Sequence, residues 1–152
     1  RERAETLLSI VRALDNAMNN TSVILLFELP GLSLLFPGDA QYENWMYALS
    51  QSNVRKRLEA VGVYKVGHHG SLNATPKTLW QGFRHRAAKG SPSRLVSVLS
   101  TKKGVHGAEE RRTEVPRRSL VRALHESSEL LATTDFARDE TVKAVTISAG
   151  TR

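Results

Sequence analysis

The chain has 152 residues, of which 40% are hydrophobic and 24% are charged, values typical of a soluble globular protein with one hydrophobic core. It contains no cysteine, which excludes disulfides, thiolate metal sites and a cysteine nucleophile. The formal net charge of +7 favours an anionic partner such as nucleic acid. The arginines are scattered, however, and few aromatic residues lie among them, so a solvated basic surface is the simpler interpretation.

We predict a single domain over residues 1–152 with no membrane segment. The longest apolar run, residues 23–27, is far shorter than the ~20 residues that a membrane-spanning helix needs. The first residues are charged and amphipathic and do not resemble a secretory signal. These features favour a cytoplasmic location.

The first half of the chain predicts one helix, then a hairpin, then two more helices. Residues 1–19 carry apolar side chains at helical spacing. Residues 22–29 predict a buried strand, and the turn at Pro30 and Gly31 joins it to a second strand, residues 33–36, in an antiparallel hairpin. Residues 40–49 predict a helix, and residues 53–60 predict another with Asn53 as its cap. The helix at 40–49 is expected to bury the following side chains: Tyr42, Trp45, Met46 and Leu49.

The second half continues the alternation of strands and helices. A strand at residues 61–66 precedes a helix that Thr75 caps, with Pro76 in its first turn, and that runs to about residue 88. A strand at 95–99 and an exposed loop at 102–112 follow. Val115 and Pro116 open a last helix, on which His125 is expected to be partly buried, and strands are predicted at 130–134 and 142–147. The fold class is therefore α/β or α+β, with a mixed sheet.

Two polar clusters follow apolar runs of strand length. Gly38 and Asp39 come after the strand at 33–36, and Gly67, His68, His69, Gly70 and Ser71 come after the strand at 61–66. Glycine permits a sharp turn where a strand ends, so an acid and an imidazole pair are expected on facing loops. A carboxylate with one or two imidazoles suits zinc, manganese or iron. The alternatives are that Asp39 is an ordinary turn or cap residue and that one histidine is structural.

These motifs resemble a known family. The sequence SLLFPGDAQ, and VYKVGHHGSLNAT further on, are similar to the C-terminal half of metallo-β-lactamase-fold hydrolases, and most of all to the competence-type DNA-uptake nuclease branch. The resemblance implies a four-layer αββα sandwich with two divalent metal ions, zinc or manganese, at one edge of its sheets. It implies that Asp39 bridges the metals, that His68 is a ligand, and that His69 lies in the second shell or contacts substrate.

The chain departs from the family in one respect. The His-x-His-x-Asp-His signature is absent, and the five histidines are His68, His69, His85, His106 and His125. We therefore expect half a site, either as the C-terminal part of a longer protein or as a truncated product, and an isolated chain that does not hydrolyse substrate efficiently.

The leading hypothesis is a metal-dependent hydrolase acting on a phosphodiester or another ester through a metal-activated water. The alternatives are a non-catalytic remnant and a basic nucleic-acid-binding or interaction module. A half-sandwich would expose one face of its sheet, so a homodimer or an association with the missing N-terminal half is expected.

Three further polar residues have possible roles at or near the site. Ser71 is a candidate substrate contact but a poor nucleophile, because a neighbouring turn residue such as His69 rarely has the required geometry. His106 is a candidate substrate contact on the long loop, with a solvated loop residue as the alternative. Lys65 is expected to face solvent or a loop.

Overall fold

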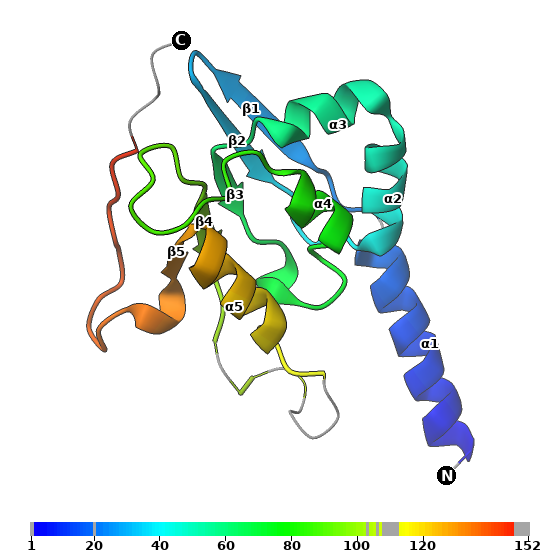
Figure 1. Cartoon of the computed structure of the whole chain (residues 1–152). Coiled ribbons are helices and arrows are strands. Elements are labelled where there is room, and N and C mark those ends of the chain that lie inside the picture. Colours follow the sequence, from blue (N-terminus) through cyan, green and yellow to red (C-terminus); the bar gives the residue numbers. More distant parts are fainter. Residues whose placement is uncertain (1, 20, 103, 106, 108–112, 148–152) are drawn as a thin grey trace.

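The computed structural model describes residues 2–19, 21–102, 104–105, 107 and 113–147 (Figure 1). Within these residues, five α-helices and five strands are arranged along the chain. The helices are α1 (Glu2–Asn19), α2 (Tyr42–Ser50), α3 (Ser52–Glu59), α4 (Lys77–Gly82) and α5 (Arg118–Ser127). The strands are β1 (Leu25–Leu29), β2 (Leu32–Phe36), β3 (Val63–Lys65), β4 (Val96–Leu99) and β5 (Glu129–Ala132).

The five strands form one mixed sheet in the order β1-β2-β3-β4-β5. β1 and β2 make the predicted antiparallel hairpin, with Leu25 opposite Phe36. The pairs β2/β3, β3/β4 and β4/β5 are parallel. The predicted α/β class, mixed sheet and hairpin are therefore confirmed.

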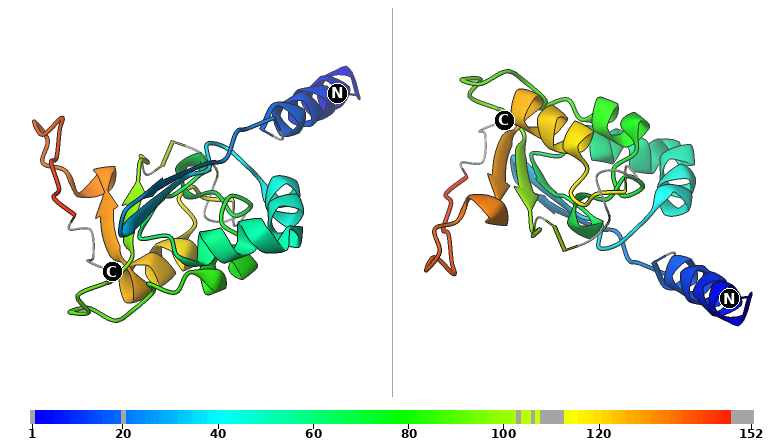
Figure 2. Two further views of the ribbon diagram at one scale, coloured as in Figure 1. Left: turned by 90° about the horizontal axis from the view of Figure 1, so that it is seen from above. Right: turned by 90° about the horizontal axis from the view of Figure 1, so that it is seen from below.

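Helices α2 to α5 cover one face of this sheet (Figures 1 and 2). The core lies between the two layers, where sheet residues Leu35, Tyr64 and Leu99 pack against Trp45 and Leu124 from the helices. Within the described residues, no element covers the opposite face, to which β1 and β2 present half-exposed leucine and phenylalanine side chains. The observed arrangement is a two-layer one, and the four-layer sandwich remains a prediction.

The first strand differs from its prediction. β1 begins at Leu25, three residues after the predicted start at Ser22, and the prediction that it is buried is wrong, because Leu25, Phe27 and Leu29 are 47%, 51% and 56% exposed. Alternate residues of a strand point to opposite faces, and only one face of β1 meets the helices. The apolar run indicates a strand with two apolar faces and cannot show that one of them lacks a covering layer.

Several helix boundaries and burials also differ. In α2, Trp45 is buried as predicted, but Tyr42 and Met46 are about half exposed, because α2 lies at the margin of the helical layer. Helix α3 begins at Ser52 with Gln51 rather than Asn53 at its N-cap. The cap of α4 is Pro76, because the hydroxyl of Thr75 is instead 2.7 Å from the buried Tyr64 hydroxyl.

The later part of the chain needs four corrections. Helix α4 ends at Gly82, not near residue 88, and α5 begins at Arg118 rather than at Val115. His125 is exposed, because it lies on the side of α5 turned away from the sheet. Residues 142–147 form no strand and are mostly exposed, because no neighbouring strand is available to pair with them in the described structure.

Candidate metal centre

Two turns meet at one edge of the sheet, and they carry the predicted ligands. β2 and β3 are parallel neighbours, so their carboxyl ends lie at the same edge, where ligands of open α/β sheets bind. The His68 N–H donates to the Gly38 carbonyl at 3.2 Å. A Cβ on Gly67 would lie 3.0 Å from that carbonyl oxygen and 3.1 Å from Cγ of Pro37. Glycine at position 67 is what allows the two turns to approach this closely.

His68 occupies a strained turn with an unsatisfied ring nitrogen. Residues His68–Gly70 form a 3-10 turn in which His68 and His69 have φ values of 41° and 54°, a left-handed conformation that non-glycine residues adopt rarely. Nδ1 of His68 is buried and has no hydrogen-bond partner among the described residues. A buried polar atom left without a partner costs about 1–3 kcal/mol, so this nitrogen is a candidate ligand atom.

The second histidine of the pair has a different environment. Nδ1 of His69 lies 2.9 Å from the carbonyl oxygen of Ser100, just after β4. That contact orients the ring and assigns the Nδ1 proton to this bond when the imidazole is neutral. The His69 side chain is exposed. The structure thus distinguishes the two histidines, with His68 against the Gly38 turn and His69 against the end of β4.

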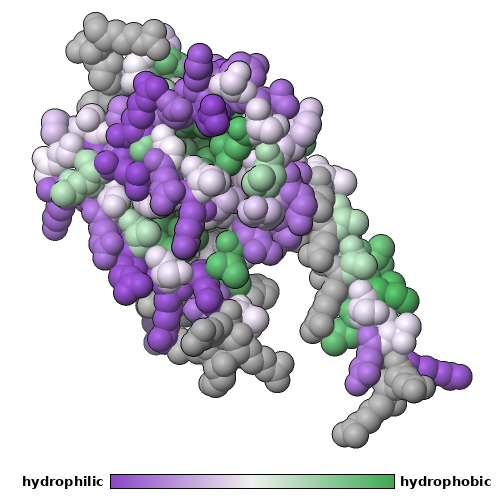
Figure 3. All heavy atoms as spheres, turned by 45° about the vertical axis from the view of Figure 1, so that its right-hand side comes forward, coloured by the Kyte–Doolittle hydropathy of each residue, from purple (hydrophilic) through white to green (hydrophobic). Residues whose placement is uncertain are grey.

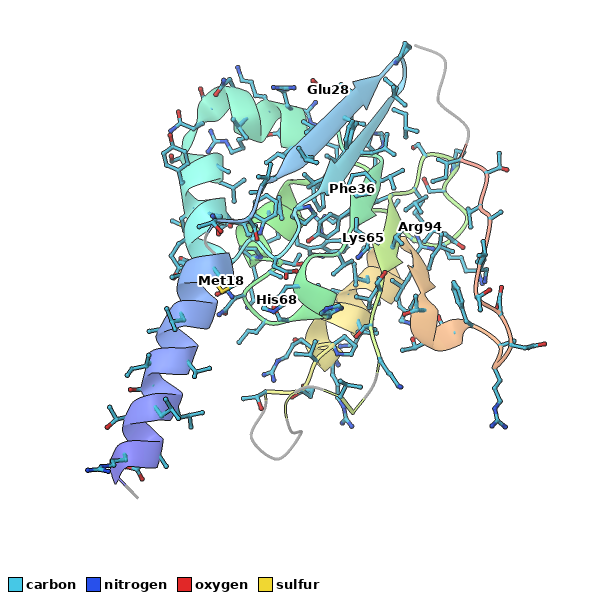
Figure 4. All side chains as sticks on the ribbon, turned by 180° about the vertical axis from the view of Figure 1, so that it is seen from behind. Met18, Glu28, Phe36, Lys65, His68 and Arg94 are labelled. Atoms are coloured by element: carbon cyan, nitrogen blue, oxygen red, sulfur yellow. The ribbon has the colours of Figure 1, made fainter. Side chains whose placement is uncertain are left out.

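Asp39 and Lys65 interact electrostatically at this edge. Asp39 is exposed, whereas Lys65 is half-buried on β3 and its ammonium donates to the Val66 carbonyl at 3.2 Å (Figure 4). Burial lowers the pKa of Lys65, and the negative charge of Asp39 partly opposes that shift. The prediction that Lys65 faces solvent or a loop is therefore incomplete, because this amine lies partly buried within the electrostatic range of the candidate carboxylate.

A cavity of about 290 Å³ lies beside His68. Its walls include Ser71, Asn73, Glu114 and Arg117, and Oγ of Ser71 is buried without a hydrogen-bond partner among the described residues. The Arg117 guanidinium lies 3.0 Å from the Glu114 carboxylate, and backbone hydrogen bonds and this cation lower the pKa of Glu114. The cavity therefore combines unsatisfied polar atoms with a fixed pair of opposite charges.

Arg117 is the cavity residue that sequence reasoning missed. Its backbone N–H donates to the Gly70 carbonyl at 2.8 Å, which fixes the start of α5 against the histidine turn. The two positions are 47 residues apart in the chain, and no local pattern links them. The run of basic residues around Arg117 is the only signal, and it does not distinguish this arginine from the others.

The donors present amount to part of a metal centre. Within the described residues, no group of three or more His, Cys, Asp or Glu side chains is placed to hold a metal ion. The turns supply one carboxylate, Asp39, and one unsatisfied imidazole, His68, whose oxygen and nitrogen donors match the preferences of zinc and manganese. His106 lies outside the described residues. These donors fit half of the implied two-metal centre and do not complete it.

No family model, curated protein or solved structure matches this chain. The metallo-β-lactamase resemblance accordingly remains a prediction from the motifs themselves. In the described part of the chain, no helix has both the length and the apolar character required to span a bilayer.

Proposed function

We propose that this chain supplies half of the catalytic site of a metal-dependent hydrolase of the metallo-β-lactamase superfamily. The observation that supports it most is the backbone contact between the Gly38 and His68 turns, which brings an acid and an imidazole to the same edge of a sheet. In this proposal Asp39 would supply a carboxylate ligand and His68 an imidazole ligand. The remaining ligands come from a polypeptide segment outside the described residues.

The chemistry follows from this donor set. Divalent ions held at such a site lower the pKa of a coordinated water and stabilise the negative charge that develops on an attacked ester or phosphate. The chain's own residues have three tasks. Asp39 and His68 position the ions, Gly67 keeps their two turns together, and the cavity beside His68 receives the substrate.

A phosphodiester is the substrate class we favour. The cavity beside His68 is lined by the Ser71 hydroxyl, the Asn73 amide and the Arg117 guanidinium, which is paired with Glu114 in the same lining. Hydroxyl, amide and guanidinium groups hydrogen-bond phosphate oxygens. The net charge of +7 also attracts polyanions. His69 is exposed on the same turn and is a candidate contact for an extended substrate.

A hydrolysis assay tests the half-site. We expect the chain alone to hydrolyse bis(p-nitrophenyl) phosphate inefficiently with zinc or manganese, because two protein ligands leave the centre incomplete. The control is the His125→Ala variant, which alters an exposed histidine on α5. Efficient metal-dependent turnover that Asp39→Ala abolishes and His125→Ala does not would show a complete centre in this chain and contradict the half-site.

The second candidate function is nucleic-acid binding by the basic surface alone. It is favoured by the net charge and predicts DNA binding that weakens steeply with salt and ignores sequence. Fluorescence anisotropy with a short DNA duplex distinguishes the two functions. Binding that is unchanged by a chelator and by Asp39→Ala supports the basic module, whereas binding that zinc strengthens only when Asp39 is present supports the hydrolase.

A further inference from the structure

The described structure leaves two apolar surfaces without a partner. We call the first the open sheet face, which consists of Leu25, Phe27, Leu29 and Phe36 on the side of β1 and β2 opposite the helices. We call the second the α1 stripe, which consists of Leu7, Leu8, Ile10, Val11, Leu14 and Met18. Figure 4 looks onto the open sheet face, and Figure 3 shows hydrophobic residues at the surface of α1.

The α1 stripe is exposed along its whole length. Its six side chains are between 45% and 70% exposed, and α1 projects away from the two-layer body (Figure 2). α1 has 18 residues, and most helix stability in proteins comes from packing of an apolar face rather than from intrinsic propensity. The length and pattern of α1 therefore indicate a helix that another surface covers.

The open sheet face is one continuous surface. The hairpin register places Phe27 opposite Leu34 and Leu25 opposite Phe36, so these side chains share one side of the sheet. The rings of Phe27 and Phe36 lie edge to face with their centroids 5.7 Å apart. A sheet with an apolar face is stable when a second layer covers it, and no described element of the same molecule does so.

We propose that two copies of this chain associate by exchanging α1, so that the α1 stripe of each copy covers the open sheet face of the other. The two surfaces are both apolar and belong to the same chain, so one reciprocal contact covers both. The stripe includes Leu8 and Ile10 at its margins and is wider than the two-position seam of a coiled coil, a width that suits a flat sheet. In such an exchange α1 keeps the projecting orientation that it has in Figure 2 and does not fold back onto its own sheet.

The area involved is sufficient for a dimer. Ten side chains per copy are about half exposed, and a large apolar side chain has roughly 200 Å² of surface. Reciprocal exchange therefore covers on the order of 2,000 Å², which is the size of a stable homodimer interface.

Light scattering coupled to size-exclusion chromatography tests the exchange with the full chain. We expect the parent to be a dimer, and both Leu14→Lys on the α1 stripe and Phe27→Lys on the open sheet face to be monomers. Ser9→Lys is the matched control, because Ser9 is exposed on the opposite side of α1, and it should remain dimeric. Circular dichroism checks that each variant is folded.

Two outcomes of this experiment overturn the proposal. A parent that stays monomeric at micromolar concentrations shows that the two surfaces do not bind each other between copies. A Leu14→Lys monomer together with a Phe27→Lys dimer shows that α1 pairs with α1 and not with the sheet.

Disulfide formation between engineered cysteines tests the exchange without relying on a variant that fails to assemble. The chain has no cysteine, so a Val11→Cys chain mixed with a Phe27→Cys chain can form only the disulfides that the assembly permits. Exchange predicts a disulfide between the two different chains. If the Val11→Cys/Phe27→Cys double variant instead forms a disulfide within one monomer, then α1 covers its own sheet and the proposal is wrong.

Discussion

His68 combines three features that seldom coincide in one residue. Its backbone has a left-handed φ of 41°, its ring nitrogen Nδ1 is buried without a partner in the described structure, and its N–H is bonded to the turn that carries Asp39. Strain of about 1–3 kcal/mol at such a residue persists only when the surrounding structure enforces it, and it is concentrated at functional sites. The left-handed φ is shared by His69, so the buried Nδ1 without a partner is the feature that favours His68 over His69 as the ligand in the proposed centre.

Gly67→Ala tests whether the close approach of the two turns matters. The added Cβ would lie 3.0 Å from the Gly38 carbonyl oxygen, and neither turn can yield without moving its backbone. We expect a loss of about 1–3 kcal/mol in the free energy of unfolding, as for other overpacked sites. Urea denaturation measures it.

Gly82→Ala is the matched control for that substitution. An added Cβ at Gly82 meets nothing within 4 Å, and the residue is the last one of α4. Replacement of glycine by alanine in such a position stabilises a protein by about 0.4–1 kcal/mol. Equal effects of the two substitutions would contradict the role given to Gly67.

The stability of the fold should decrease in strong alkali because of Tyr64. Burial raises the pKa of Tyr64 from 10.0 to about 12. The folded chain therefore retains a phenol proton that the unfolded chain releases, and the free energy of unfolding falls as the pH rises from 10 to about 12. The two pKa units correspond to on the order of 3 kcal/mol.

Tyr64→Phe isolates this contribution. The variant loses the hydrogen bond to Thr75, at a cost of about 1 kcal/mol near neutral pH, but it has no phenol to ionise. Urea denaturation between pH 8 and pH 11 should therefore show a shallower decline for the variant than for the parent. Parallel declines would mean that the Tyr64 hydroxyl is not shielded from water.

At the scale of elements, the sequence predicted type and order better than boundaries. Every described helix and strand was anticipated in its place, because hydrophobic periodicity and turn residues are local signals. The N-cap of α4 was not anticipated, because the Thr75 hydroxyl contacts the hydroxyl of Tyr64, a core residue eleven positions away. The strand predicted at residues 142–147 does not form for a related reason. A strand needs a neighbouring strand to pair with, and local composition does not show whether one is available.

The attachment of α2 to the candidate site depends on Trp45. This side chain is fully buried, and its indole N–H donates to the Ala74 carbonyl at 2.9 Å, in the loop that follows the histidine turn. Trp45→Phe removes the donor and some volume, so we expect a loss of about 2–3 kcal/mol in the free energy of unfolding. Thermal or urea denaturation measures it.

Tyr47→Phe serves as the comparison on the same helix. Tyr47 is 74% exposed, and surface substitutions of this kind stay within about 0.5 kcal/mol of the parent. A Trp45→Phe variant as stable as Tyr47→Phe would show that the loop after the histidine turn does not depend on α2 for its position.

At the scale of the whole molecule, the described residues form one layer of helices packed against one face of the sheet, and they leave the open sheet face and the α1 stripe uncovered. The apolar run at residues 22–29 predicts a buried strand, and only the resemblance to half of a sandwich implies an exposed sheet face. The described structure contains such a face on β1 and β2. The sequence could not indicate that α1 projects from the body, because a helical periodicity shows which face is apolar and not what covers it. Glu114 and Arg117 are only three positions apart, but no local pattern places their ion pair beside His68.

Zinc titration by isothermal calorimetry tests the Asp39–His68 half-site most directly. We predict weak binding of zinc to the parent chain, weaker than at centres with three or four protein ligands. The binding should be lost in the Asp39→Ala/His68→Ala double variant and retained in His125→Ala. Zinc binding that is equal in the parent and the double variant, or absent from both, would contradict the account.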